Sequence, residues 1–437
     1  MHRMNLLRIT TVILAIAIAV PAYAASNSAV PERSSQGAQV IKIASQSPLS
    51  GPQSSLGTAI SNGAKLAVQQ LKKPIEDLGF QVQYVPYDDQ ATPDVGVSNA
   101  HNIVADASIL AVIGHLNSGV AIPSSQVYVQ DHLVMISPAN TNPKVTSTDS
   151  TKETNNRVCG RDDIQGPVGA IYAAKTLKVK SVWVLDDKTA YGAGVAQAFK
   201  DEATKQGLNV VGFTETEEAS NFDAILTPIA AAAPDLIYWG GIYDKGGPLF
   251  KQARAKGIKS QFMGADGLDS TDLPKLAGDA VIGTIFTTTA GPASMFPDAK
   301  QFITDYETAY NVKQVETYAP EAYAATQVAM NGILTAIKAN GGKLPSRAQV
   351  AAAVRATSEF PTVIGKITFD AEGDPQIATY YTVKITSSDP TVYESTGKQV
   401  LDTVTAPSPL YAQMQASMQA TMAAMAPGAT MAATKAQ

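Results

Sequence analysis

From residue 38 onward, short apolar runs rich in β-branched residues alternate with longer segments of helical spacing. This alternation is typical of parallel sheets covered by helices on both faces. The first series of expected strands is 39–45, 82–87, 110–114 and 133–137, with helices ending near residue 71 and at 95–105 and 121–130. A second series of strands follows at 181–185, 209–213, 236–239 and 261–263, with helices near 164–177, 192–206, 221–231 and 245–256. The pattern predicts an α/β protein with two doubly wound lobes.

The pattern after residue 298 is mostly helical, with expected helices at 298–310, 319–338 and 347–356. The turn-forming sequence 370–374 lies between apolar segments at 365–369 and 378–385, which predicts a β-hairpin.

Residues 397–437 are rich in Ala, Met and Gln, and we expect a tail outside the fold. Five apolar residues of the tail would share one helix face, either as an apolar stripe or as thioether ligands for Cu(I). They are Leu410, Met414, Met418, Met422 and Met425.

Residues 1–24 have the features of an export signal. Arg3 and Arg8 form a basic segment at the N-terminus, and an unbroken apolar run follows at 12–20. Ala22-Tyr23-Ala24 then provides a small-x-small cleavage site. The apolar run is shorter than the roughly 20 residues that a membrane span needs. We expect cleavage after Ala24, a flexible leader at 25–37, and a soluble mature protein in the periplasm, since no cysteine follows the cleavage site for lipid attachment.

The composition and the absence of known motifs argue against several classes of protein and of functional site. The chain is 45% hydrophobic and 16% charged, which excludes a disordered chain, and its net charge of -5 argues against nucleic-acid binding. The single Cys159 excludes an internal disulfide and a Cys-based zinc site, and we expect it to be an inert buried thiol. No Gly-x-Ser-x-Gly, His-Glu-x-x-His or phosphate-loop motif occurs, so we expect no catalytic activity, cofactor or metal.

Small polar residues follow two of the expected strands. The segment 114–119 (GHLNSG) leaves one strand and enters a helix, and 137–141 (SPANT) follows the next strand. Ligands of open parallel sheets bind at such strand ends, and a helix start with free backbone N–H groups accepts an anion. The alternative is that these residues only cap helices.

These two segments overlap a longer series of stretches that are found together in one known family. The stretches are 48–52 (PLSGP), 87–89 (YDD), 112–116 (VIGHL), 136–139 (ISPA), 187–192 (DKTAYG), 238–241 (YWGG), 252–254 with 261–264, and 365–373. In order and spacing, from about residue 40 to 393, the chain resembles the periplasmic leucine/isoleucine/valine-binding proteins, which are the substrate-binding components of branched-chain amino-acid ABC importers.

The resemblance implies two lobes joined by three crossovers that close on a ligand. Lobe 1 would be 38–161 plus 289–363, and lobe 2 would be 162–288 plus 364–396. It further implies a monomer that delivers a neutral, branched-chain amino acid to an ABC permease. Alternative ligands are aromatic amino acids, amides such as urea, and small carboxylates. An alternative role is a ligand sensor with a separate membrane partner.

The resemblance also assigns roles to residues. Ser118 and Thr141, with the backbone from Ala139 through Asn140, would bind the α-carboxylate and part of the α-ammonium. Asp266 would pair with the ammonium across the cleft. Tyr191 and Tyr318 would close the pocket.

Four features depart from the family pattern, the last of them a missing disulfide. Leu56 and Ile242 replace aromatic residues beside the ligand side chain, which implies a wider, aliphatic pocket unless Tyr243 fills the space. Asp266 stands where the family carries Glu, and Ala91 and Asn117 stand where it carries a disulfide.

Overall fold

The computed structural model describes residues 38–425, so the expected signal peptide 1–24 and leader 25–37 lie outside the described residues. The first sheet has five parallel strands in the order β2-β1-β3-β4-β5. The strands are β1 (Gln39–Ser47), β2 (Phe80–Asp88), β3 (Ile109–Gly114), β4 (Val134–Ser137) and β5 (Asn155–Arg157).

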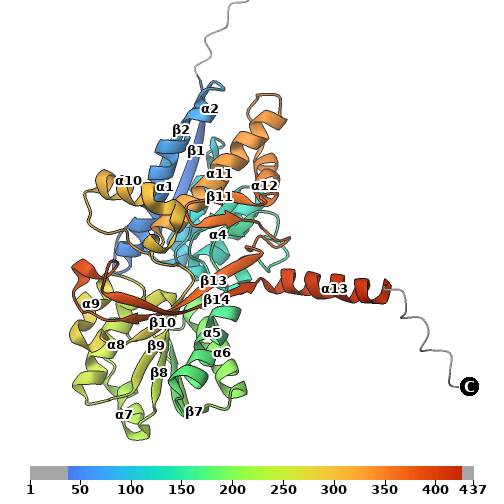
Figure 1. Ribbon diagram of the computed structural model, residues 1–437. Coiled ribbons are helices and arrows are strands. Elements are labelled where there is room, and N and C mark those ends of the chain that lie inside the picture. Colours follow the sequence, from blue (N-terminus) through green and yellow to red (C-terminus); the bar gives the residue numbers. More distant parts are fainter. Residues whose placement is uncertain (1–37, 426–437) are drawn as a thin grey trace, which may run out of the picture. The chain divides into compact units, whose positions relative to one another are not determined.

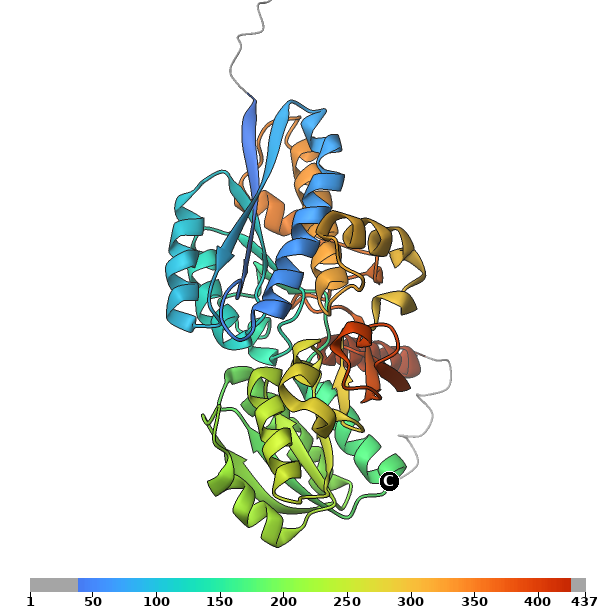
Figure 2. The same cartoon turned by 90° about the vertical axis from the view of Figure 1, so that its left-hand side faces the viewer.

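The second sheet has seven strands in the order β14-β13-β10-β9-β8-β6-β7. Five of them are parallel, whereas β13 runs antiparallel to β10 and β14 antiparallel to β13. The strands are β6 (Ser181–Asp186), β7 (Asn209–Glu215), β8 (Leu236–Gly240), β9 (Gln261–Gly264), β10 (Ile285–Thr288), β13 (Ile377–Ile385) and β14 (Lys398–Pro407). In Figure 1 and Figure 2 the strands of the first sheet are blue to cyan, and those of the second are green to yellow except for the orange-red to red β13 and β14.

Helices cover both faces of each sheet, which is why all six residues of β3 are buried. The helices of the first sheet are α1 (Ser54–Leu71), α2 (Lys73–Glu76), α3 (Pro93–Ala105), α4 (Ser118–Gln130), α10 (Lys300–Tyr310), α11 (Ala319–Ala339) and α12 (Arg347–Arg355). Those of the second are α5 (Asp162–Tyr172), α6 (Ala190–Lys205), α7 (Asp223–Ala232), α8 (Tyr243–Ala255) and α9 (Asp272–Ala277). In Figure 1 the orange helices α11 and α12 lie among the blue elements, although they are far apart in the sequence.

The α/β class and the two doubly wound sheets are confirmed. We call the first sheet with its helices lobe 1, and the second sheet with its helices lobe 2. The chain from Ala38 onward forms one contact unit. The expected residue boundaries of the two lobes therefore stay a prediction.

The predicted hairpin of 365–369 with 378–385 is wrong. β12 (Gly365–Ile367) pairs with β11 (Phe360–Thr362), and β13 pairs with β10 and β14. A single bridge between Phe369 and Pro375 is all that joins the two segments across the turn. The turn was correctly located, but the strands on either side of it, β12 and β13, pair with other strands and not with each other.

The prediction that residues 397–437 lie outside the fold is also wrong in part. β14 (Lys398–Pro407) pairs with β13 along its length. The side chain of Lys398 is buried, and its Nζ lies 2.6 Å from Asp269 and 2.8 Å from Glu394. The helix α13 (Pro409–Met425) follows, with Met414 and Met418 exposed. Residues 426–437 lie outside the described residues.

Within residues 38–425, no helix has the length and apolarity required for a membrane crossing. Cys159 is buried, and burial raises the pKa of its thiol. This is the environment of an unreactive thiol, as expected.

Candidate functional site

Several of the residues singled out in the sequence lie where the strands end and the next helices begin. Leu116 and Asn117 follow β3, and Ala139 follows β4. In lobe 2, Ile242 follows β8 and Asp266 follows β9. Because parallel strands end at one edge of a sheet, these residues meet at the edges where the two lobes face each other.

A small cavity lies between these edges. It is lined from lobe 1 by Leu56, Leu116, Asn117, Ala139 and Tyr318, and from lobe 2 by Tyr191, Ile242, Asp266 and Gly267. Its volume is about 20 Å³, which is room for roughly one water molecule. A Cβ on Gly267 would lie 2.6 Å from the Gly241 carbonyl oxygen and 2.9 Å from the Tyr191 ring, so glycine permits this close packing.

Asp266 is the charged centre of the cavity. Its carboxylate accepts hydrogen bonds from the hydroxyls of Tyr318 (2.7 Å) and Tyr191 (2.8 Å) and from Gln165 Nε2 (3.1 Å). Burial raises the pKa of Asp266, and these three donors oppose the rise by stabilising the charged form. Tyr318 comes from lobe 1, so this carboxylate already links the two lobes.

Of the proposed anion-binding residues, only Ala139 lines this cavity. Ser118 begins α4, and its Oγ accepts from the backbone N–H of Asn142 at 3.4 Å. Thr141 is buried, and its hydroxyl has no hydrogen-bond partner. A buried donor without a partner is costly, and a ligand oxygen would satisfy it.

Asn140 differs from the other members of this group. Its side chain accepts from the His115 backbone N–H at 3.0 Å and donates to the Leu116 carbonyl at 2.8 Å. Its backbone N–H donates to Ser137 Oγ at 2.8 Å. Asn140 thus holds the ends of β3 and β4 together, and in this geometry its own polar groups are occupied.

The aliphatic wall contains Leu56 and Ile242, both buried. Tyr243 does not line the cavity, because its hydroxyl donates to the Pro52 carbonyl at 2.9 Å. It therefore does not replace the missing aromatic residue. A pocket wider than the cavity seen here requires the lobes to separate.

Several hydrogen bonds hold the lobes together around the cavity. Besides the bonds of Tyr318 and Tyr243, Asn142 Nδ2 donates to the Ala190 carbonyl at 2.6 Å. Gln53 Nε2 donates to Asp244 at 3.3 Å. Glu316 accepts from the backbone N–H of Thr271 at 3.0 Å and from its hydroxyl at 2.7 Å. These bonds would have to break for the cleft to open.

Asp162, the first residue of α5, is not among the residues that the sequence pattern predicted for the site. Both of its carboxylate oxygens are buried and lack hydrogen-bond partners. Gln165 Oε1 and the hydroxyls of Tyr238 and Thr287 are also buried and without partners. The available signal was the acidic pair in 161–163 (RDD) directly before a helix, but only the fold shows which of the two acids is buried.

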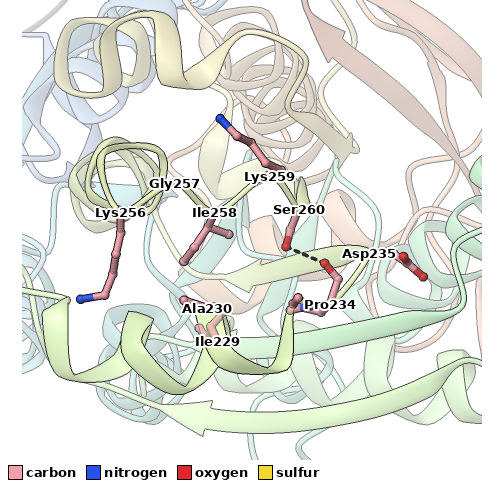
Figure 3. A pocket seen from close by; sticks show the side chains of 10 residues that line it. Ile229, Ala230, Pro234, Asp235, Lys256, Gly257, Ile258, Lys259 and Ser260 are labelled. Atoms are coloured by element: carbon pink, nitrogen blue, oxygen red, sulfur yellow. Dashed lines mark hydrogen bonds between the residues drawn. The ribbon is translucent and has the colours of Figure 1, made fainter.

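A larger hollow lies at the opposite, amino ends of β8 and β9 (Figure 3), with a volume of about 490 Å³. Two of its polar side chains, Ser260 and Asp235, are already paired within the protein. Ser260 donates to the Pro234 carbonyl at 2.6 Å, and Asp235 points away from Ile258 and accepts from the backbone N–H groups of Lys180 and Ser181. Neither of these two side chains offers an unpaired group to a ligand.

Among residues 38–425, no group of His, Cys, Asp and Glu side chains is arranged to hold a metal ion. The chemistry of the cavity is instead that of a buried carboxylate, two tyrosine hydroxyls and an aliphatic wall. It suits a small molecule with one cationic donor group and an apolar part.

The sequence and structure have known relatives. A model of the periplasmic binding protein family matches residues 40–398. A Leu/Ile/Val-binding protein homologue of Brucella abortus is 36% identical over 346 residues, covering 78% of this chain and 89% of the relative. A Leu/Ile/Val-binding protein of Rhizobium johnstonii is 37% identical over 335 residues, covering 76% and 88%.

Solved structures share the architecture. A leucine-binding protein from Thermotoga maritima superimposes with a TM-score of 0.73 at 27% sequence identity, covering 83% of this chain and 98% of that protein.

Proposed function

Because this chain belongs to the periplasmic binding protein family, we propose that it captures a neutral α-amino acid in the periplasm and delivers it to an ABC importer. The first candidate ligand is a branched-chain aliphatic amino acid. The names of the Brucella and Rhizobium relatives support this choice. We assign the protein no reaction and propose that it acts as a monomer.

The observation that carries the proposal is the position of Asp266. A carboxylate buried between two lobes needs a positive partner, because a desolvated charge is costly when it is unpaired. The α-ammonium of an amino acid meets this need. The ammonium would replace the tyrosine hydroxyls at the Asp266 carboxylate, or bind beside them. Closure of the lobes would then depend on the ligand.

The carboxylate of the ligand would lie against neutral donors. Ser118 at the start of α4 and the unpartnered Thr141 hydroxyl are the donors we propose. Helix starts favour anions through their free N–H groups. The side chain would then face Leu56 and Ile242, which accept apolar groups and offer no hydrogen bonds.

The test is a thermal-shift screen of residues 25–437 against all amino acids and simple amides. A ligand present at 100 times its Kd adds about 2.7 kcal/mol to stability. We expect shifts with leucine, isoleucine and valine. Shifts with benzoate or urea alone would contradict the amino-acid proposal.

Size preference is tested in the same screen with valine, leucine, methionine and phenylalanine. Each further buried methylene contributes about 0.8 kcal/mol if the aliphatic wall leaves room for it. We expect methionine and phenylalanine to bind at least as well as valine. A strong preference for valine would show that the space of the missing aromatic rings is filled by the protein.

A further inference from the structure

A second cavity lies where the chain passes between the two lobes. Its volume is about 250 Å³. The chain connects the lobes at 158–161, between β5 and α5, at 289–299, between β10 and α10, and at 356–376, between α12 and β13. All three segments line this cavity, which we call the connection cavity. It shares no lining residue with the cavity at Asp266 and is therefore a separate site.

Two buried polar groups of the connection cavity lack hydrogen-bond partners. Glu321 lies in the first turn of α11 and is 1% exposed, and neither of its carboxyl oxygens has a partner. The hydroxyl of Thr289, directly after β10, is also buried without a partner. Both residues line the cavity. Buried polar groups without partners raise the free energy of the folded protein, so a ligand that bonds to them gains affinity.

The cations near Glu321 are already paired with other acids. Lys366 also lines the cavity, but its side chain is 65% exposed and its Nζ lies 3.2 Å from a surface carboxylate. Lys398 lies 2.6 Å from Asp269 and 2.8 Å from Glu394. Burial raises the pKa of Glu321 most, and the charges of Asp269 and Glu394 raise it further, whereas that of Lys398 lowers it. The surroundings of this carboxyl group are thus short of positive charge, which favours a cationic ligand.

The remainder of the wall suits an apolar group. It contains the aliphatic side chains of Ile364 and Ile377 and the aromatic side chains of Phe296 and Tyr381. Aromatic rings attract cations to their faces, and aliphatic groups accept an alkyl chain. The volume lies below the range of about 300–1,000 Å³ that is typical of pockets for drug-sized ligands, so the ligand must be smaller.

We propose that the connection cavity is a second binding site and that it takes a small organic ammonium ion with an aliphatic part. The ammonium would bind the Glu321 carboxylate and donate to the Thr289 hydroxyl oxygen, while the alkyl chain lies against Ile364 and Tyr381. An occupant would hold the three connecting segments in the arrangement in which the lobes touch. Occupancy and lobe closure would then favour each other. This linkage to the cleft rests on the proposed function, whereas the site itself does not.

The experiment is titration calorimetry with n-butylammonium as the probe, n-butanol as its neutral counterpart and butyrate as the anion. The mature protein is first saturated with leucine, so that the Asp266 carboxylate in the cleft is occupied. If no amino acid binds, Asp266→Asn takes the place of the loaded protein. The titration is done at about pH 8.5, because the pKa of Glu321 is raised to about 8. At that pH an alkylamine, like the lysine side chain, keeps its proton.

We expect the protein to bind n-butylammonium, and Glu321→Gln to bind it about tenfold or more weakly, because the amide carries no charge. The control Glu359→Gln makes the same change of charge beside the same cavity. Its side chain is 70% exposed and pairs with Lys366, so the affinity should match the wild type. A cooperative thermal transition checks that each variant is folded. No binding by the wild type, or equal binding by Glu321→Gln, would overturn the site. Equally tight n-butanol or butyrate would overturn the cationic ligand.

The linkage is tested by measuring the affinity for leucine with and without n-butylammonium. Competition for Asp266 would weaken leucine binding equally in the wild type and in Glu321→Gln. We therefore expect the probe to leave the wild type with about a fivefold or greater advantage over the variant. The same response in both proteins would overturn the linkage alone. Failure of every amino acid to bind would overturn the proposed function and the linkage, and the titration of Asp266→Asn would still decide the site.

Discussion

The two ends of β8 and β9 bear hollows of opposite character. At the amino ends the hollow is large, about 490 Å³, and the side chains of Ser260 and Asp235 there are paired within the protein. At the carboxyl ends the cavity is about 20 Å³, but buried polar groups around it, including those of Thr141 and Asp162, have no partners. The two ends of the same strands thus differ in whether the polar groups beside them already have hydrogen-bond partners.

This difference shows that size is a poor guide to function in this molecule. An open groove with satisfied groups has nothing to gain from a ligand beyond apolar contact. Buried polar groups without hydrogen-bond partners raise the free energy of the folded protein, and a ligand that bonds to them removes this desolvation cost. The carboxyl ends of the strands are also where open α/β sheets bind ligands.

The largest effect is expected for Asp266→Asn, because it removes the ionised partner of the ligand's ammonium. Breaking a buried charge pair costs about 3–5 kcal/mol, so calorimetry should show no amino-acid binding. The matched variant at the amino ends is Asp235→Asn, which should leave the affinity unchanged. Retained binding in Asp266→Asn would place the ammonium elsewhere.

Removing one neutral donor should cost less. For Thr141→Ala and for Ser118→Ala we expect a loss of about 1.5–3 kcal/mol in binding free energy, as for hydrogen bonds to a charged group. The control at the amino ends is Ser260→Ala, which removes a bonded hydroxyl and should lower stability but not affinity. If Thr141→Ala and Ser118→Ala bound the ligand as tightly as the wild type and Ser260→Ala do, the carboxylate of the ligand would lie elsewhere.

Glu321 of α11 tests whether an unpaired carboxyl group is enough to mark the ligand site. Both of its oxygens are buried without partners beside a hollow of about 250 Å³ that Thr289 and Tyr381 also line. Burial raises the pKa of Glu321 from 4.5 to about 8. The folded state therefore holds this proton more tightly than the unfolded state, and stability is lost as pH rises from about 4.5 to about 8.

In Glu321→Gln this pH-dependent loss should be absent. We expect the variant to match the wild type near pH 4.5 and to exceed its stability at pH 8 by about 1–3 kcal/mol, measured by urea unfolding across this range. Its affinity for leucine should stay the same. A stability difference independent of pH would show that Glu321 is ionised throughout, and a loss of affinity would place it in the site.

The smallest effect concerns the C-terminal segment. A chain ending at Ser408 keeps β14 and loses α13, and we expect its affinity for leucine to change by less than about twofold. A chain ending at Asp402 loses half of β14 and should be less stable, since β13 would lose its pairing partners. A tenfold loss of affinity in the longer chain would show that α13 acts on the lobes.

The fold was largely predictable from the sequence because its signals are local. Alternating apolar runs and helical spacing place every strand of the first four-strand series within a few residues of its observed position. Residues directly after strands, such as Ala139 and Asp266, could be assigned to one site because parallel strands end at a common edge.

Two errors share a physical cause. The turn at 370–374 and the composition after residue 397 are local features, whereas strand pairing depends on distant partners. β14 joins the sheet through β13 and through the buried pair of Lys398 with Asp269. No local feature of the segment 398–407 predicts its pairing with β13 or the contact of Lys398 with Asp269.

The sequence by itself determined the α/β class, the two strand series and the set of residues after the strands. Only the tertiary structure decided how those residues are used. It placed Asn140 in an internal brace, turned Tyr243 toward Pro52, and left Asp162 rather than Asp163 buried without a donor. The reason is that hydrogen bonding and desolvation depend on which groups meet across the fold, and residues distant in the chain supply those groups.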